Sequence, residues 1–152
     1  MDLPRDFGDL LEASAVEAVE YMLVGGHSVA FHARPRATKH IDVLLRGTHG
    51  NLERAARALE VFGARASVVG DLRQLGESEI VYLGQPPLRV DLLRTIDGIA
   101  TDEVFEHAVT AELDALSIRV IARDDLVTNK RAAGRPQNLL DVAIPERARG
   151  KR

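Results

Sequence analysis

The sequence predicts an α+β fold in which a small mixed sheet has helices packed on it. The first observation is that apolar runs typical of strands alternate with segments of helical periodicity between residues 6 and 62. The second is a pair of strand-like runs, 78–83 and 88–93, on either side of the turn 84–87, which predicts a hairpin. Alternating strands and helices followed by paired strands are typical of a mixed sheet covered by helices.

Length and composition favour one soluble globular domain. The 152 residues suffice to bury a core, and 45% hydrophobic with 28% charged residues is the usual balance of a globular chain. We expect a single domain at 1–148 and a disordered tail at 149–152. A net charge of −3 provides no general attraction to nucleic acid or membranes, and the absence of cysteine excludes disulfides and thiolate metal sites. No apolar run approaches the roughly 20 residues of a membrane span and no signal-peptide pattern is present, so we expect a cytoplasmic protein without a membrane partner.

Periodicity and turn residues place the individual elements. Helices are expected at 6–18, in a short segment after Gly26, and at 51–62, 101–108, 124–133 and 137–147. Strands are expected at 20–24, 39–46, 78–83, 88–93 and 116–122. His49 or Asn51 is expected to cap the helix 51–62, Gly63 to end it, and Thr101 to cap the helix that follows it. The stretch 64–77 stays ambiguous, because Val68 and Val69 also fit a short edge strand.

The stretch 23–45 combines features that indicate a binding site. An apolar run ends at Gly25-Gly26, a short helical segment follows, and a second apolar run contains one carboxylate, Asp42. Glycine lets a backbone approach a ligand closely, and the free N–H groups at a helix start suit phosphate. Asp42 would be costly to bury unless it is paired, hydrogen-bonded or bound to a metal.

A second apolar strand, 88–93, repeats this pattern with Asp91. Both carboxylates also have a structural interpretation. Asp42 then lies at a strand edge in water, and Asp91 forms an ion pair with Arg89 or Arg94.

The order of these residues resembles the DNA polymerase beta-like nucleotidyltransferases, and within them the small bacterial minimal nucleotidyltransferases and abortive-infection toxins. The positions in register with the motif of that branch are Gly25, Gly26, Val29, His32, Pro35, Arg36, Thr38, Ile41 and Asp42. Ala33 stands where glycine is usual, and His40 stands where the first metal-binding aspartate is expected. A second block, 125–142, resembles the lysine-containing motif of the family, with Lys130 at its lysine. The resemblance spans about 21–142 and implies the polymerase beta-like nucleotidyltransferase fold.

The resemblance also implies a metal site. Nucleotidyl transfer holds a nucleoside triphosphate in line with a hydroxyl and neutralises the developing charge with divalent cations. The three metal-binding positions of the family correspond to His40, Asp42 and Asp91, with Mg²⁺ or Mn²⁺ as the implied cofactor. Asp42 and Asp91 are the implied catalytic residues, and Asp91 is the one that takes the proton of the hydroxyl. Imidazole suits Mn²⁺ better than Mg²⁺, so His40 indicates either an altered metal site or a degenerate one.

The implied nucleotide-binding residues are Gly25, Gly26, Ser28, Arg36 and Lys130. The side chains of Ser28 and Arg36 are expected to meet phosphate, and Lys130 corresponds to a lysine that reaches the nucleotide phosphates in relatives. Three alternatives stay open. The Ser28 hydroxyl fits a backbone bond at a helix start, Arg36 fits a support of its loop, and Lys130 fits a solvated lysine on a helix.

Two functions follow from this pattern. The first is an enzyme that transfers a nucleoside monophosphate from NTP to a hydroxyl on a protein or RNA. The second is a binding module that keeps the fold with a weakened site, for example as one half of a toxin–antitoxin pair. His40 distinguishes the two functions, because it changes a metal-binding position. The sequence shows no basic patch interleaved with aromatic residues for RNA, so a partner protein is a plausible acceptor.

Overall fold

The computed structural model describes residues 5–25, 40–85, 88–113 and 116–133. The helix expected after Gly26, the helix at 137–147 and the tail at 149–152 lie outside these ranges. The described residues form five helices, namely α1 (Arg5–Val16), α3 (His49–Phe62), α4 (Ala66–Arg73), α5 (Thr101–His107) and α6 (Arg123–Ala133). They also form six strands, namely β1 (Tyr21–Val24), β2 (His40–Leu45), β3 (Val81–Gln85), β4 (Leu88–Leu93), β5 (Val109–Leu113) and β6 (Leu116–Val120).

The strands form one mixed sheet in the order β3-β4-β2-β1-β6-β5. The central pair, β2 and β4, is parallel, and β1 lies antiparallel to β2 on its other side. The edge strands β3 and β5 form antiparallel pairs with β4 and β6. This arrangement confirms the predicted mixed sheet and the predicted hairpin between β3 and β4.

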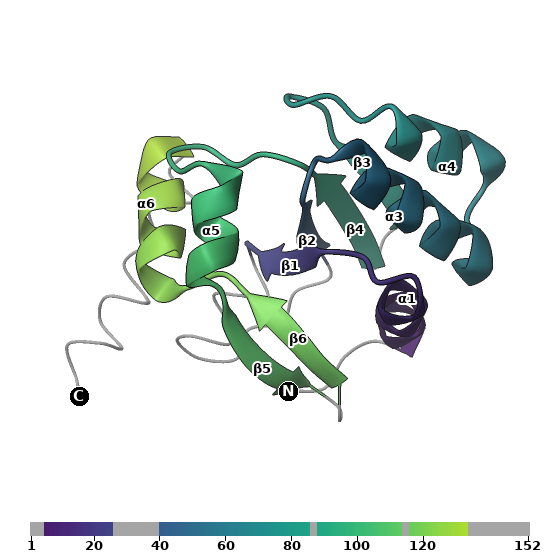
Figure 1. Ribbon diagram of the computed structural model, residues 1–152, viewed down its shortest axis with the longest axis horizontal. Helices are drawn as coiled ribbons and strands as arrows, with labels where there is room; N and C mark the ends of the chain where they lie inside the picture. Colours follow the sequence, from purple (N-terminus) through teal and green to yellow (C-terminus); the bar gives the residue numbers. More distant parts are fainter. Residues whose placement is uncertain (1–4, 26–39, 86–87, 114–115, 134–152) are drawn as a thin grey trace.

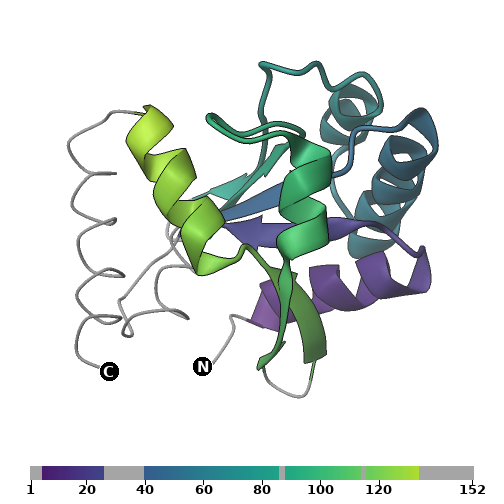
Figure 2. The same ribbon diagram turned by 60° about the vertical axis from the view of Figure 1, so that its left-hand side comes forward.

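Helices cover both faces of the sheet. Figures 1 and 2 show α1, α3 and α4 on one side of the strands and α5 and α6 on the other. Strand β2 contributes to both cores, because successive side chains of a strand point to opposite faces. Its Ile41 and Val43 belong to the larger core under α1, α3 and α4, whereas Leu44 belongs to the smaller one under α5 and α6. Burial on both faces explains why β2 reads as an apolar run in which Asp42 is the exception.

The segment 66–73, which the sequence pattern leaves ambiguous, is the helix α4 and not a short edge strand. Val69 and Leu72 lie three residues apart and are both buried, as expected for one helical face. Arg73 of α4 forms ion pairs with two glutamates of α3, from Nε to Oε2 of Glu53 at 3.0 Å and from Nη2 to Oε1 of Glu60 at 2.9 Å. The hydrogen bond from Arg73 lowers the pKa of Glu53 below its ordinary value. Tertiary packing therefore decides a segment whose local sequence is ambiguous.

Strand β5 is an element that the prediction lacks, since the sequence pattern indicates no element at 109–113. It pairs with β6 at the edge of the sheet, with Thr110 opposite Arg119. Ala111 is buried, while Thr110 and Glu112 are exposed. A short strand that buries a small alanine shows little hydrophobic alternation, which explains why the pattern misses it.

The caps of two helices differ from the prediction. Thr48, not His49 or Asn51, caps α3, because its Oγ1 accepts a hydrogen bond from the backbone N–H of Asn51 at 3.2 Å. Asn51 is fully buried, and its amide bonds the backbone of Glu20 and Arg46. Thr101 is the first residue of α5, and its hydroxyl donates to the Arg94 carbonyl oxygen instead of capping the helix.

Helices α1 and α3 end in the same hydrogen-bonded motif. After α3, the N–H of Ala64 donates to the Leu59 carbonyl, and Gly63 adopts a left-handed conformation with φ of 100°. After α1, the N–H of Val19 donates to the Ser14 carbonyl, and Ala18 takes the left-handed position with φ of 58°. Only the second end places a Cβ in this conformation, which L-residues other than glycine adopt at a cost.

We expect Ala18→Gly to stabilise the protein by about 0.5–1 kcal/mol, because relief of the left-handed alanine outweighs the added entropy of the unfolded glycine. Ala18 is exposed, so the change removes no buried methyl group. Gly63→Ala makes the reverse change at the end of α3 and should destabilise the protein by a similar amount. Urea unfolding of the three proteins measures both changes. A lower stability of Ala18→Gly would show that the left-handed alanine is not strained.

Within the described ranges, no helix has both the length and the apolar character that a bilayer span requires.

Candidate active site

Two carboxylates lie directly opposite each other on the central parallel strands. Asp42 of β2 and Asp91 of β4 are register partners, so their side chains share one face of the sheet. Asp91 is 5% exposed, and Asp42 is half-buried. The predicted convergence of these two residues is therefore present in the fold.

The register of β2 and β4 divides this face into two parts. Two residues beyond the carboxylates, Leu44 lies opposite Leu93, and both contact the core under α5 and α6. Two residues before them, His40 lies opposite Arg89. The face thus changes from apolar to polar at Asp42 and Asp91, which places the carboxylates at the border of the helix-covered part.

The turn after β1 lies against the first of these carboxylates. Val24 is the register partner of Asp42, and the next residue, Gly25, has φ of 83°. A Cβ built on Gly25 would overlap the Asp42 carboxylate. Glycine is therefore required here both for its backbone conformation and for close approach of the aspartate. Three of the predicted nucleotide-binding residues, Gly26, Ser28 and Arg36, lie outside the described residues.

Asp91 has a cationic partner on its own strand. The guanidinium of Arg89 donates from Nε to Oδ1 of Asp91 at 2.9 Å and from Nη2 to Oδ2 at 3.3 Å. The ion pair of the structural interpretation of Asp91 is thus present, formed with Arg89 and not with Arg94, which donates to the carbonyl of Leu75. The guanidinium also lies over the ring of Tyr82, with Cζ 4.8 Å from the ring centroid.

Arg89 and Tyr82 are the residues of this site that the sequence reasoning did not assign to it. Tyr82 is the register partner of Asp91 on the edge strand β3. The spacing of Arg89, two residues before Asp91, and the alternation in β3 were the available signals. Arg89 shares a face with Asp91 because the two lie two residues apart on one strand. The place of Tyr82 on that face depends on the register of the β3–β4 hairpin.

Lys130 lies in the last turn of α6 and is only 9% exposed, which does not fit a solvated lysine. Its helix is docked on the loop between β4 and α5. Asn129 donates a hydrogen bond to the carbonyl of Asp97 at 3.0 Å, and a Cβ on Gly98 would overlap Ala132. Contact of Lys130 with nucleotide phosphates stays a prediction.

The donor set at the carboxylate pair fits a divalent cation. Carboxylate oxygens are the ligands that Mg²⁺ and Mn²⁺ prefer, and here two come from opposite positions of neighbouring strands. Among the described residues, no three histidine, aspartate or glutamate side chains gather as a metal-binding group. The proposed role of His40 as the third ligand stays a prediction.

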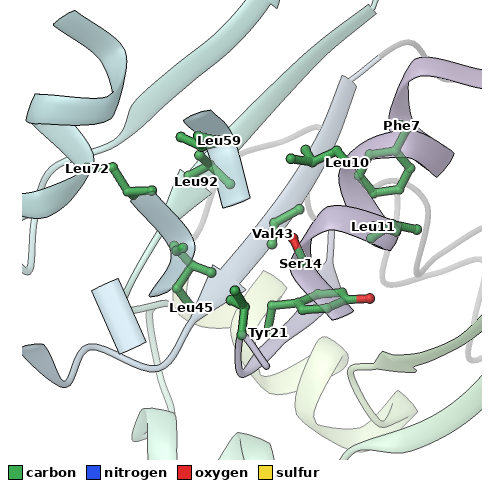
Figure 3. A pocket seen from close by; sticks show the side chains of 12 residues that line it. Phe7, Leu10, Leu11, Ser14, Tyr21, Val43, Leu45, Leu59, Leu72 and Leu92 are labelled. Carbon is green, nitrogen blue, oxygen red and sulfur yellow. The ribbon is translucent and has the colours of Figure 1, made fainter. Parts of the chain in front are cut away.

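An internal cavity lies on the other face of the sheet and belongs to the core. Figure 3 shows it between α1 and the strands, with Phe7, Leu10 and Leu11 above Val43 and Tyr21. Its volume of about 20 Å³ leaves room for a single water molecule, far below the volume of a nucleotide site. Burial raises the pKa of Tyr21 to about 12, so this side chain is neutral at neutral pH. This cavity is therefore part of the core, and we place the candidate active site at the carboxylate pair on the strength of its register and the Gly25 turn.

Comparison with known proteins identifies the fold. No family model and no curated protein matches the sequence. Among solved structures, the chain is similar to the lincomycin-bound crystal structure of the lincosamide antibiotic adenylyltransferase LnuA. The TM-score is 0.62 at 11% identity, over 95% of this chain and 97% of that one. It is also similar to a proposed nucleotidyltransferase from Thermotoga maritima, with a TM-score of 0.58 at 12% identity over 99% and 98% of the two chains. The chain therefore has the nucleotidyltransferase fold, as the sequence resemblance implied.

Proposed function

We propose that this protein is a metal-dependent nucleotidyltransferase that transfers a nucleoside monophosphate from NTP to a hydroxyl group. The observation that carries the proposal is the in-register pair Asp42 and Asp91, set beside the Gly25 turn in a chain with the nucleotidyltransferase fold. A carboxylate pair on one sheet face suits binding of divalent cations, and an adjacent glycine turn suits close approach of phosphate.

The residues of the site have different roles in the transfer, namely metal binding and acceptance of a proton. Asp42 and Asp91, with His40, would hold Mg²⁺ or Mn²⁺, which supplies Lewis-acid stabilisation of charge on the transferred phosphoryl group. Asp91 also accepts the proton of the attacking hydroxyl. The hydroxyl oxygen forms a bond to the α-phosphorus, the bond from the α-phosphorus to the bridging oxygen breaks, and pyrophosphate leaves.

The nucleotide would lie across the turn after β1. The backbone of Gly25 and Gly26 approaches the phosphates, Ser28 and Arg36 donate to them, and Lys130 adds positive charge from α6. In support of this role, Lys130 is 9% exposed, which does not fit a lysine that is only solvated.

The acceptor that we propose is a hydroxyl of a protein or an RNA, with the partner protein of a toxin–antitoxin pair as the first to test. The name of LnuA indicates that this protein of similar fold adenylylates an antibiotic. A small compound with a hydroxyl group therefore belongs in the same assay. We also propose that residues 1–148 act as one domain.

His40→Asp tests whether the metal site is altered or degenerate. If the rest of the site is built for two cations, the added carboxylate should raise Mg²⁺-dependent transfer about tenfold or more, because bound metals supply several kcal/mol of transition-state stabilisation. Mn²⁺ should help the wild type more than the variant, since imidazole is acceptable to the softer ion.

The assay measures transfer from α-labelled NTP by both proteins, each with Mg²⁺ and with Mn²⁺. His49→Asp, at the start of α3, is the control for adding a carboxylate elsewhere. If the protein is a binding module, neither the wild type nor His40→Asp transfers label, although both bind NTP.

A further inference from the structure

The Arg89 guanidinium is bonded to the Asp91 carboxylate, which the proposed metal site requires. It is held from two sides, by both oxygens of Asp91 and by the face of the Tyr82 ring. The Asp91 side chain is 7% exposed, whereas that of Arg89 is 40% exposed. Asp91, the proposed metal ligand, is therefore the less accessible partner of the pair. Arg89 is the more accessible partner and is the side chain that can move away.

The charges explain why a cation belongs at this position. Asp42 and Asp91 are opposite each other, and two neighbouring carboxylates are unfavourable until a positive charge offsets them. A guanidinium that bonds both oxygens of Asp91 supplies this charge. A divalent cation on Asp91 needs the same oxygen lone pairs, and it is repelled by the guanidinium at close range.

We propose that the Arg89 guanidinium is an intramolecular counter-cation of Asp91. A divalent cation must displace it from at least one oxygen of Asp91, and the Tyr82 ring keeps the guanidinium beside the site. The inference rests on the proposed metal-dependent function. Arg89 thereby sets the cation concentration at which the site becomes loaded. In the opposite role, Arg89 would only hold Asp91 in its productive orientation. The two roles differ in sign, because loss of a competitor strengthens metal binding and loss of a support weakens it.

The test is Mn²⁺ binding, measured from the electron paramagnetic resonance signal of free Mn²⁺, together with thermal unfolding of the metal-free proteins. Arg89→Met keeps much of the side-chain length without the charge. It should bind Mn²⁺ about tenfold more tightly and melt at a lower temperature without metal. Tyr82→Leu should shift Mn²⁺ affinity in the same direction by about two- to threefold, because the guanidinium loses its aromatic contact. Tyr82→Phe keeps the ring and should bind like the wild type.

Arg119→Met is the matched control. It removes one positive charge from an exposed position on β6, so it separates the local effect of Arg89 from a change in net charge. Arg119→Met should leave Mn²⁺ affinity unchanged.

Two outcomes would overturn the inference, and they are distinguishable. If the wild type binds Mn²⁺ and Arg89→Met binds it equally or more weakly, Arg89 is not a competitor and the proposed function stands. If neither the wild type nor Arg89→Met binds Mn²⁺, the metal site of the proposed function is itself wrong, and the inference falls with it.

Discussion

Asp91→Asn is expected to lower the turnover of nucleotidyl transfer by at least about 10³-fold while the protein stays folded. The amide is close in size to the carboxylate, but it neither accepts a proton at neutral pH nor offers an anionic oxygen to a cation. Asp42→Asn should cause a similar loss through metal binding alone. Because both residues act in one site, the double variant should be little worse than either single variant.

Thermal unfolding provides a second readout of the same site. Mn²⁺ should raise the melting temperature of the wild type by mass action, and it should raise those of both single variants less. Asp71→Asn on α4 is the control, since this exposed carboxylate belongs to the helix layer on the opposite face of the sheet. Equal Mn²⁺-induced shifts in all four proteins would exclude a shared metal site at Asp42 and Asp91.

Gly25→Ala is expected to have the second-largest effect, because the new methyl group and the Asp42 carboxylate cannot occupy the same space. The alanine must also adopt φ near 83°, which costs about 1–2 kcal/mol. We expect a loss of stability of about 2–4 kcal/mol from strain and overlap together, and loss of Mn²⁺ binding as Asp42 is pushed aside.

Gly63→Ala separates these two causes. Gly63 also has a left-handed conformation, with φ of 100°, but a Cβ there would contact nothing within 4 Å. The control therefore carries the backbone strain without the collision and should keep full Mn²⁺ affinity. If both variants lose the same stability and both bind Mn²⁺, the close approach of Gly25 and Asp42 has no role in the site.

The elements closest to the site could be predicted from the sequence, because their signals are local. The run 88–93 is apolar throughout except at Arg89 and Asp91, and it forms β4 with the predicted bounds. The expectation that Asp42 and Asp91 converge combined this pattern, one aspartate in each of two apolar strands, with the metal-binding positions that the family resemblance implied. Since a buried carboxylate is costly without a partner, a pair of them is a strong signal.

The remaining features depend on contacts between distant segments. The contact of Arg89 with the Tyr82 ring depends on the register of β3 on β4, which a sequence pattern does not fix. Helix α4 is settled by Arg73 meeting two glutamates of α3, and β5 by pairing with β6. The burial of Lys130 likewise depends on how α6 docks on the loop before α5. Each is a tertiary contact that overrides or supplements local propensity.

Transfer of a nucleotide at the carboxylate pair is measured most directly as covalent label from α-labelled NTP. The wild type is incubated with Mn²⁺ and each of the four NTPs, in the presence of cell-extract proteins, bulk RNA and small hydroxyl compounds. We expect label that survives denaturation on one class of acceptor, with equimolar pyrophosphate, and no label with Asp91→Asn. NTP binding by the wild type without label on any acceptor, or label that is unchanged in Asp91→Asn, would contradict transfer at this site.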